Sequence, residues 1–129
     1  MRRSSLAFAA ASALFVASSA LVYAHGEALT FALIPKNTDN VFFSVVEEGC
    51  KSRAALLPNV ECLYVGSKDE DPAAQAATVD AIVNGTYGRV DGISISVSNA
   101  EILTPAIDRA VGAGIPVITF DSDAAGSRR

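Results

Sequence analysis

The chain has 129 residues, enough for one domain, and half of them are hydrophobic, so a folded core is expected and general disorder is excluded. Its net charge of −4 disfavours a nucleic-acid partner, because phosphates attract basic surfaces. The single histidine, His25, lies near the start of the chain, which argues against a metal site and against Ser/His or Cys/His catalysis.

Residues 1–24 have the pattern of a cleavable signal peptide. Arg2 and Arg3 give a positive start, residues 6–22 are apolar and rich in Ala, and the segment ends in Val-Tyr-Ala at 22–24. These last residues place small side chains at the two positions that a signal peptidase reads. A membrane anchor is the alternative, but the apolar run of about 17 residues is at the short limit for spanning a bilayer. We expect cleavage after Ala24 and export of the remainder.

The only cysteines, Cys50 and Cys62, are expected to form a disulfide, since a cysteine pair in an exported chain usually does. Cys50 falls on the predicted apolar face of a helix, with Val46, Ala54 and Leu57. Cys62 lies in the strand that follows, and a helix packed on its neighbouring strand can bring two such positions together. Two buried free thiols remain the alternative.

Beyond the signal, strand patterns alternate with helical patterns. Strands are predicted over 28–34, 60–65, from 92 onward, and over 115–120, and helices over 41–57, from 72 to about 84, and from 100 to 111. In the first helix the apolar residues at 42, 45, 46, 50, 54 and 57 are taken as the packed face. Asn40 or Asp39 is the expected cap of that helix, Asn99 caps the third, and Pro105 is placed in the first two turns of the third. This order predicts an α/β fold with a parallel, doubly wound sheet, right-handed crossovers and helices on both faces.

Polar residues follow the strands at one edge of this sheet. Asn37, Asp39 and Asn40 follow the first strand, Ser96, Ser98 and Asn99 end the third, and Asp121 ends the fourth. Open α/β sheets bind ligands at this edge, and a carboxylate there can accept two ligand hydroxyls. The structural alternatives are helix caps for Asn40 and Asn99, and a solvated loop acid or cap for Asp121.

Phe42 and Phe43 open the first helix. One ring is expected to face the sheet as core, and the other to point toward the strand ends, where an aromatic face can pack on the C–H face of a sugar ring. Core packing is the alternative for either ring.

Enzyme motifs are weak. The first strand is followed by neither G-x-G-x-x-G nor G-x-x-x-x-G-K-[ST], so the chain has no dinucleotide fingerprint and no phosphate-binding loop. We therefore expect no cofactor and no catalytic residues.

Four segments in order resemble one family: 34–43 (IPKNTDNVFF), 75–83 (QAATVDAIV), 90–96 (VDGISIS) and 113–123 (AGIPVITFDSD). The chain resembles the N-terminal part of type 1 periplasmic binding proteins, the ribose-binding-like substrate-binding components of sugar importers of the ABC class. The resemblance implies a flavodoxin-like lobe, incomplete, in which residues 25–129 form an N-terminal lobe truncated before the first hinge crossing. It assigns Asn40 and Phe42 or Phe43 to the ligand wall and Asp121 to sugar hydroxyls. Where the family often has Asn-Pro-Phe-Phe, this chain has Val41 in place of the proline.

The function implied is that of a periplasmic solute-binding protein, with a monosaccharide or similar polyol as ligand and a permease in the inner membrane as partner. The intact parent is expected to be a monomer. The main alternative is a periplasmic sensor component that presents a small signal molecule to a membrane receptor. Two further alternatives are an enzyme on a flavodoxin-like sheet and the effector domain of a lactose-repressor-type regulator. The signal peptide and the lack of a helix-turn-helix argue against the regulator.

Overall fold

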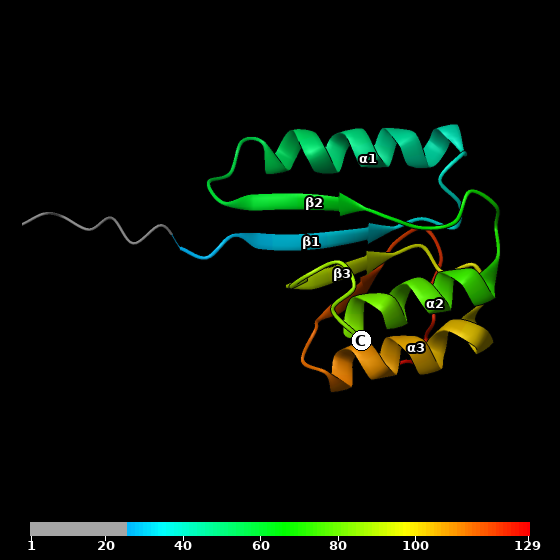
Figure 1. Ribbon diagram of the computed structural model, residues 1–129. Helices are drawn as coiled ribbons and strands as arrows, with labels where there is room; N and C mark the ends of the chain where they lie inside the picture. Colours follow the sequence, from blue (N-terminus) through cyan, green and yellow to red (C-terminus); the bar gives the residue numbers. More distant parts are fainter. Residues whose placement is uncertain (1–25) are drawn as a thin grey trace, which may run out of the picture.

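The computed structural model describes residues 26–129, so the predicted signal peptide and its cleavage point lie outside the described residues. Strands and helices alternate through this range as β1 (Leu29–Ile34), α1 (Val41–Ala54), β2 (Val60–Tyr64), α2 (Pro72–Val83), β3 (Gly92–Ile95), α3 (Ala100–Gly112) and β4 (Val117–Thr119). All neighbouring strands pair in parallel. Helix α1 lies on one face of the sheet, and α2 and α3 lie on the other (Figure 1). The predicted doubly wound α/β sheet is confirmed.

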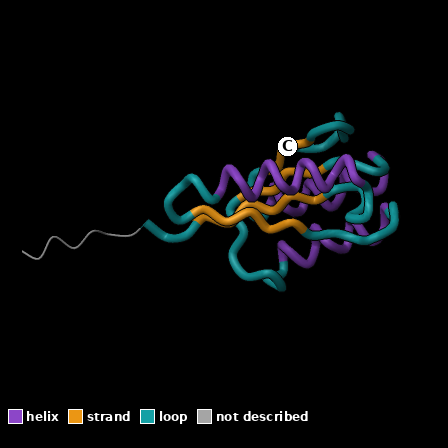
Figure 2. The backbone as a smooth tube through the Cα atoms, turned by 90° about the horizontal axis from the view of Figure 1, so that it is seen from above, coloured by secondary structure: helices purple, strands orange, loops and turns teal. Residues whose placement is uncertain are grey.

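The strand order is β2-β1-β3-β4, so the chain moves outward from β1 to β2 and then returns to the other side of β1. This reversal places a topological switch point between β1 and β3, and open α/β sheets bind ligands in the crevice beyond the strand ends at such a point. The carboxyl ends of the strands face the right-hand side of Figure 1. Figure 2 shows from above that loops gather beyond these ends.

The main core lies between the sheet and the α2–α3 layer. Its fully buried members come from both strands and helices: Ile34, Val79, Ile95, Leu103, Ile107. Burial of such side chains stabilises the fold by roughly 1.5–3 kcal/mol each. The opposite face of the sheet is less covered, because α1 packs on β2 while Phe31 and Ile118 remain 42% and 65% exposed.

Helix α1 turns inward only part of the predicted apolar face, since Val46 and Cys50 are half-buried. Phe43 and Ala54 are buried, whereas Phe42 and Val45 are 54% and 65% exposed. Leu57, predicted as the last turn of the helix, lies beyond its end at Ala54 and is also exposed. Apolar residues occur on adjacent positions of this helix, so the periodicity alone was compatible with more than one buried face.

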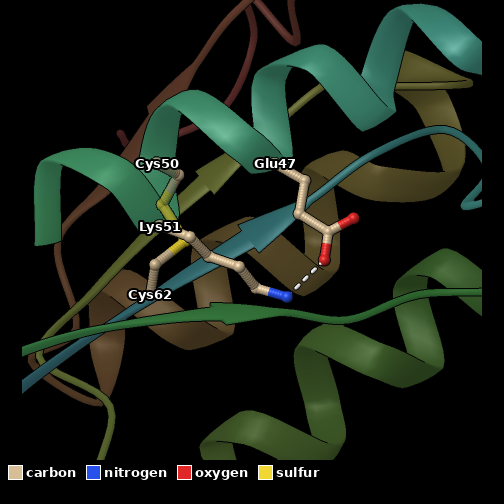
Figure 3. The surroundings of a disulfide bond; sticks show 4 residues. All are labelled: Glu47, Cys50, Lys51 and Cys62. Atoms are coloured by element: carbon tan, nitrogen blue, oxygen red, sulfur yellow. Dashed lines mark hydrogen bonds and ion pairs between the residues drawn. A yellow bond between two sulfur atoms is a disulfide. The ribbon is translucent and has the colours of Figure 1, made fainter. Parts of the chain in front are cut away.

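The predicted disulfide is confirmed. Cys50 of α1 and Cys62 of β2 are bonded with a Cα–Cα distance of 6.0 Å, next to the exposed Glu47–Lys51 ion pair (Figure 3). Both cysteines are half-buried. The bond therefore joins α1 covalently to the edge strand on which it packs.

Side chains at the helix starts account for the helix boundaries. Asn40, rather than Asp39, caps α1 by accepting a hydrogen bond from the backbone N–H of Phe42 at 2.9 Å, and Asn99 caps α3 through Ile102 at 3.0 Å. Asp71 caps α2, whose first residue is Pro72. Pro105 lies in the second turn of α3, as predicted. Strand β4 is shorter than the predicted 115–120. No helix within residues 26–129 has the length and apolar character needed to cross a membrane.

Candidate functional site

Three strand ends meet at the carboxylate of Asp121. Ser96, which follows β3, donates its hydroxyl to Asp121 Oδ2 at 2.8 Å, and Lys36, which follows β1, pairs with the same oxygen at 3.2 Å. Ser122 donates a second hydrogen bond to Oδ2 at 3.2 Å. The backbone of Asp121 has a positive φ of 60°, a left-handed conformation that Asp tolerates better than most residues.

All three of these contacts fall on Oδ2. Within residues 26–129, Oδ1 takes part in no hydrogen bond, and the Asp121 side chain is 34% exposed. The Ser96 hydroxyl lowers the pKa of Asp121, and the Lys36 ammonium adds to this effect, while partial desolvation opposes it. The group is therefore an ionised carboxylate with one oxygen fixed by the protein and one oxygen open to a ligand hydroxyl.

This environment gives a prediction about pH. Because the folded state holds the pKa of Asp121 below its ordinary value of 3.8, the resulting stabilisation is fully present above pH 3.8. It is lost as the pH falls through the lower, folded-state pKa. We expect Ser96→Ala and Lys36→Met each to raise the pKa of Asp121, because the Ser96 hydrogen bond is the largest single cause of the lowered pKa and Lys36 adds both a hydrogen bond and its charge. Side-chain carboxyl titration by NMR measures both shifts, and an unchanged pKa in either variant would contradict the assignment.

The two phenylalanines at the start of α1 take different environments, in agreement with the expectation that one is core. Phe43 is 3% exposed, and its ring centroid lies 5.1 Å from that of Phe42 and 6.2 Å from that of Phe120, both in edge-to-face geometry. Phe42 is 54% exposed. The aromatic cluster links the start of α1 to the residue just before Asp121, and Phe42 is its exposed ring.

Asn37, Asp39 and Asn40 lie in a separate polar hollow. They line it together with residues from the β2–α2 loop, Lys68, Asp69 and Glu70, and its volume is about 370 Å³. Phe42, Ser98 and Asp121 are not among the lining residues. The predicted site residues are thus divided between this hollow and the Asp121 cluster, since the strand order places the β2–α2 and β4 loops on opposite sides of β1.

Ser98 and Asn99 have structural partners. The backbone N–H and hydroxyl of Ser98 both donate to Gln75 Oε1, at 3.0 and 2.7 Å, and Asn99 caps α3. Asn40 and Asn99 therefore both act as helix caps through their side-chain oxygens. Their side-chain N–H groups make no hydrogen bond within residues 26–129.

Sequence reasoning did not select Lys36, Gln75 or Phe120. Lys36 and Phe120 each lie at or near the end of a predicted strand, and this position could have indicated that they belong to the site. Gln75 lies inside a helix, and nothing in its local sequence indicates its contacts. No group of three or more His, Cys, Asp or Glu side chains suited to a metal ion occurs in the described part of the chain.

In sequence and in fold, the chain is similar to known binding proteins. The family described as periplasmic binding protein domain matches residues 31–129. The D-ribose/D-allose-binding protein of Pseudomonas aeruginosa is 33% identical over 94 residues, which cover 70% of this chain and 28% of that protein.

Solved structures give the same picture. GanP, a glucose-galactose binding protein from Geobacillus stearothermophilus, matches with a TM-score of 0.73 and 31% identity over 81% of this chain and 36% of its own. A solute-binding protein from Burkholderia graminis in complex with D-arabinose matches with a TM-score of 0.66 and 27% identity, over 80% of this chain and 34% of its own. LsrB from Clostridium saccharobutylicum in complex with AI-2 matches with a TM-score of 0.68 and 27% identity, over 74% of this chain and 28% of its own. The chain therefore spans about a third of the length of the relatives it matches.

Proposed function

Because this chain belongs to the periplasmic binding protein domain family, we propose that residues 25–129 form the N-terminal lobe of a periplasmic protein that captures a monosaccharide or similar polyol for an ABC-type importer. Its partner is then a permease in the inner membrane, and the intact protein is a monomer. The observation that carries the proposal is the Asp121 carboxylate, with Oδ2 held by Ser96 and Lys36 and Oδ1 open at the ligand-binding edge. The sugars named for three relatives are in keeping with it.

The chemistry of the site suits a sugar. An ionised carboxylate accepts hydroxyl donors, and hydrogen bonds to a charged group contribute more than those between neutral groups. The exposed ring of Phe42 supplies an apolar surface, and Lys36 supplies a cationic donor, so polar and aromatic groups occur at the same rim.

The second candidate is a sensor component that presents a small signal molecule to a membrane receptor. The similarity to LsrB in complex with AI-2 supports it, because a family member of comparable similarity binds a ligand other than the sugars named above. Such a protein would share the Asp121 rim, so the two candidates differ in ligand and partner rather than in fold.

Ligand titration tests the proposal. We expect D-ribose, D-allose, D-arabinose or D-galactose to shift the backbone NMR signals of Ser96, Asp121 and Phe42 in the 129-residue chain, with weak affinity because one rim cannot enclose a ligand. Signals of Asn84 and Ala113, which end α2 and α3 at the opposite edge of the sheet, serve as the internal control. Shifts with AI-2 alone would favour the second candidate, and the absence of shifts at the rim with every ligand in a two-lobed protein containing this lobe would contradict both.

Export is a separate prediction. Because residues 1–24 carry the signal-peptide pattern, mass spectrometry of secreted or periplasmic material should give a chain that starts at His25. Uncleaved protein in the cytoplasm would contradict this assignment.

A further inference from the structure

Gln75 is the most completely bonded side chain near the candidate site. It lies in the first turn of α2 and is 2% exposed, and it and Ser96 are the buried polar residues of the described part of the chain. Its place inside α2, beneath the rim, distinguishes it from the predicted polar site residues, which all lie in loops.

The side-chain amide of Gln75 makes four hydrogen bonds. Nε2 donates to the carbonyl oxygens of Pro35 at 2.8 Å and Ser96 at 2.7 Å, and Oε1 accepts from the backbone N–H and the hydroxyl of Ser98. A primary amide has two N–H donors and an oxygen with two acceptor sites, so its whole hydrogen-bonding capacity is used. A buried amide that only stabilises the core could find its hydrogen-bond partners anywhere in the fold. The four partner groups of Gln75 all lie at the switch point between β1 and β3.

The groups held by Gln75 are the neighbours of Asp121. Pro35 follows β1 and directly precedes Lys36, which pairs with Asp121. Ser96 follows β3, and while its carbonyl is held by Gln75, its hydroxyl donates to Asp121. Gln75 thus spans the carboxyl ends of β1 and β3 and fixes the backbone on both sides of the Asp121 carboxylate.

We propose that Gln75 is the positioning residue of this rim: it fixes the backbone at Pro35 and Ser96, and through Lys36 and Ser96 it sets the place of the Asp121 carboxylate. Gln75 itself does not touch the ligand. Ser98 belongs to this support, because its hydroxyl proton is directed to Gln75. The consequence for ligand affinity rests on the proposed function, whereas the consequence for Asp121 does not.

The first experiment needs no ligand. The side-chain carboxyl of Asp121 is titrated by NMR in the 129-residue chain, in wild type and in Gln75→Leu. The side-chain amide is replaced by an apolar group of similar size, so the Ser96 and Lys36 contacts should loosen and the pKa of Asp121 should rise toward 3.8.

A matched control separates positioning from general loss of stability. Val79 lies one turn along the same helix, is fully buried and packs in the main core, so Val79→Ala destabilises the fold without touching the rim. We expect Val79→Ala to keep the wild-type titration of Asp121. If Gln75→Leu also keeps it, or if Val79→Ala shifts it equally, the proposal is wrong.

Two further measurements complete the test. If Gln75→Leu does not fold, the wild-type side-chain N–H₂ signals of Gln75 decide the question, since they should be protected from exchange with solvent, and fast exchange would overturn the proposal. In a two-lobed protein containing this lobe, Gln75→Leu should weaken sugar binding by about 10- to 100-fold, the effect found for residues that orient metal ligands, while Val79→Ala should not. A wild-type two-lobed protein that binds no sugar would count against the proposed function, but the Asp121 titration would still test Gln75.

Discussion

Removal of the disulfide by the double substitution Cys50→Ser/Cys62→Ser is expected to lower the free energy of unfolding by about 3 kcal/mol. The bond closes a short loop, with a sequence separation of 12, between α1 and β2. The stabilisation comes mainly from restraint of the unfolded chain, and in the folded state the bond adds to the packing of α1, along which only Phe43 and Ala54 are buried. Urea unfolding of the oxidised chain and of the double variant measures the difference.

A nearby surface pair provides the control. Lys51→Gln removes the exposed Glu47–Lys51 ion pair beside the disulfide (Figure 3) and should change stability by less than about 1 kcal/mol. In material from an oxidising compartment, thiol labelling after denaturation should find no free cysteine. Full labelling of both cysteines, or equal stability with and without the bond, would contradict the prediction.

Substitution Asp121→Ala is expected to weaken sugar binding by about 10- to 150-fold in a two-lobed protein containing this lobe. A second rim would close over the ligand and exclude water, so the bond to the carboxylate would be buried. Losing a hydrogen bond to a charged partner then costs about 1.5–3 kcal/mol, and each 1.4 kcal/mol is a factor of ten in affinity. In the 129-residue chain the same sugar should bind in the millimolar range or not at all. Calorimetry on both proteins measures the affinities.

Asp123 offers a matched control two residues away. Its Oδ1 accepts hydrogen bonds from the Thr119 hydroxyl and the backbone N–H of Ala124 and pairs with the Arg129 guanidinium, so its contacts hold the C-terminal tail and do not join the ends of β1 and β3 as those of Asp121 do. Asp123→Ala should therefore leave sugar affinity unchanged while loosening the C-terminal tail. Unchanged affinity in Asp121→Ala would remove this residue from the site, and tight binding by the 129-residue chain would show that a second lobe is unnecessary.

The amino-acid sequence by itself determined the order of strands and helices, the cap at Asn99 and the place of Pro105, and it narrowed the cap of α1 to Asn40 or Asp39. Each of these depends on neighbours in the chain or on a regular spacing: an N-cap bonds to an N–H two or three residues on, and an apolar period shows within one element. The disulfide was predicted because the chain has only two cysteines and carries an export signal. The parallel, doubly wound class followed from that alternation and was confirmed.

The tertiary structure alone decided which side chains meet. Periodicity could not assign the inward face of α1, because Phe42 and Val45 are as apolar as the residues that are buried. The pairing of Lys36 with Asp121, and the bonds of Gln75 to Pro35 and Ser96, join residues far apart in the chain. They exist because the sheet places β1 between β2 and β3, which also separates Asn37 and Asp39 from Asp121. Strand order is set by packing of the whole domain, so no local pattern in the sequence contains it.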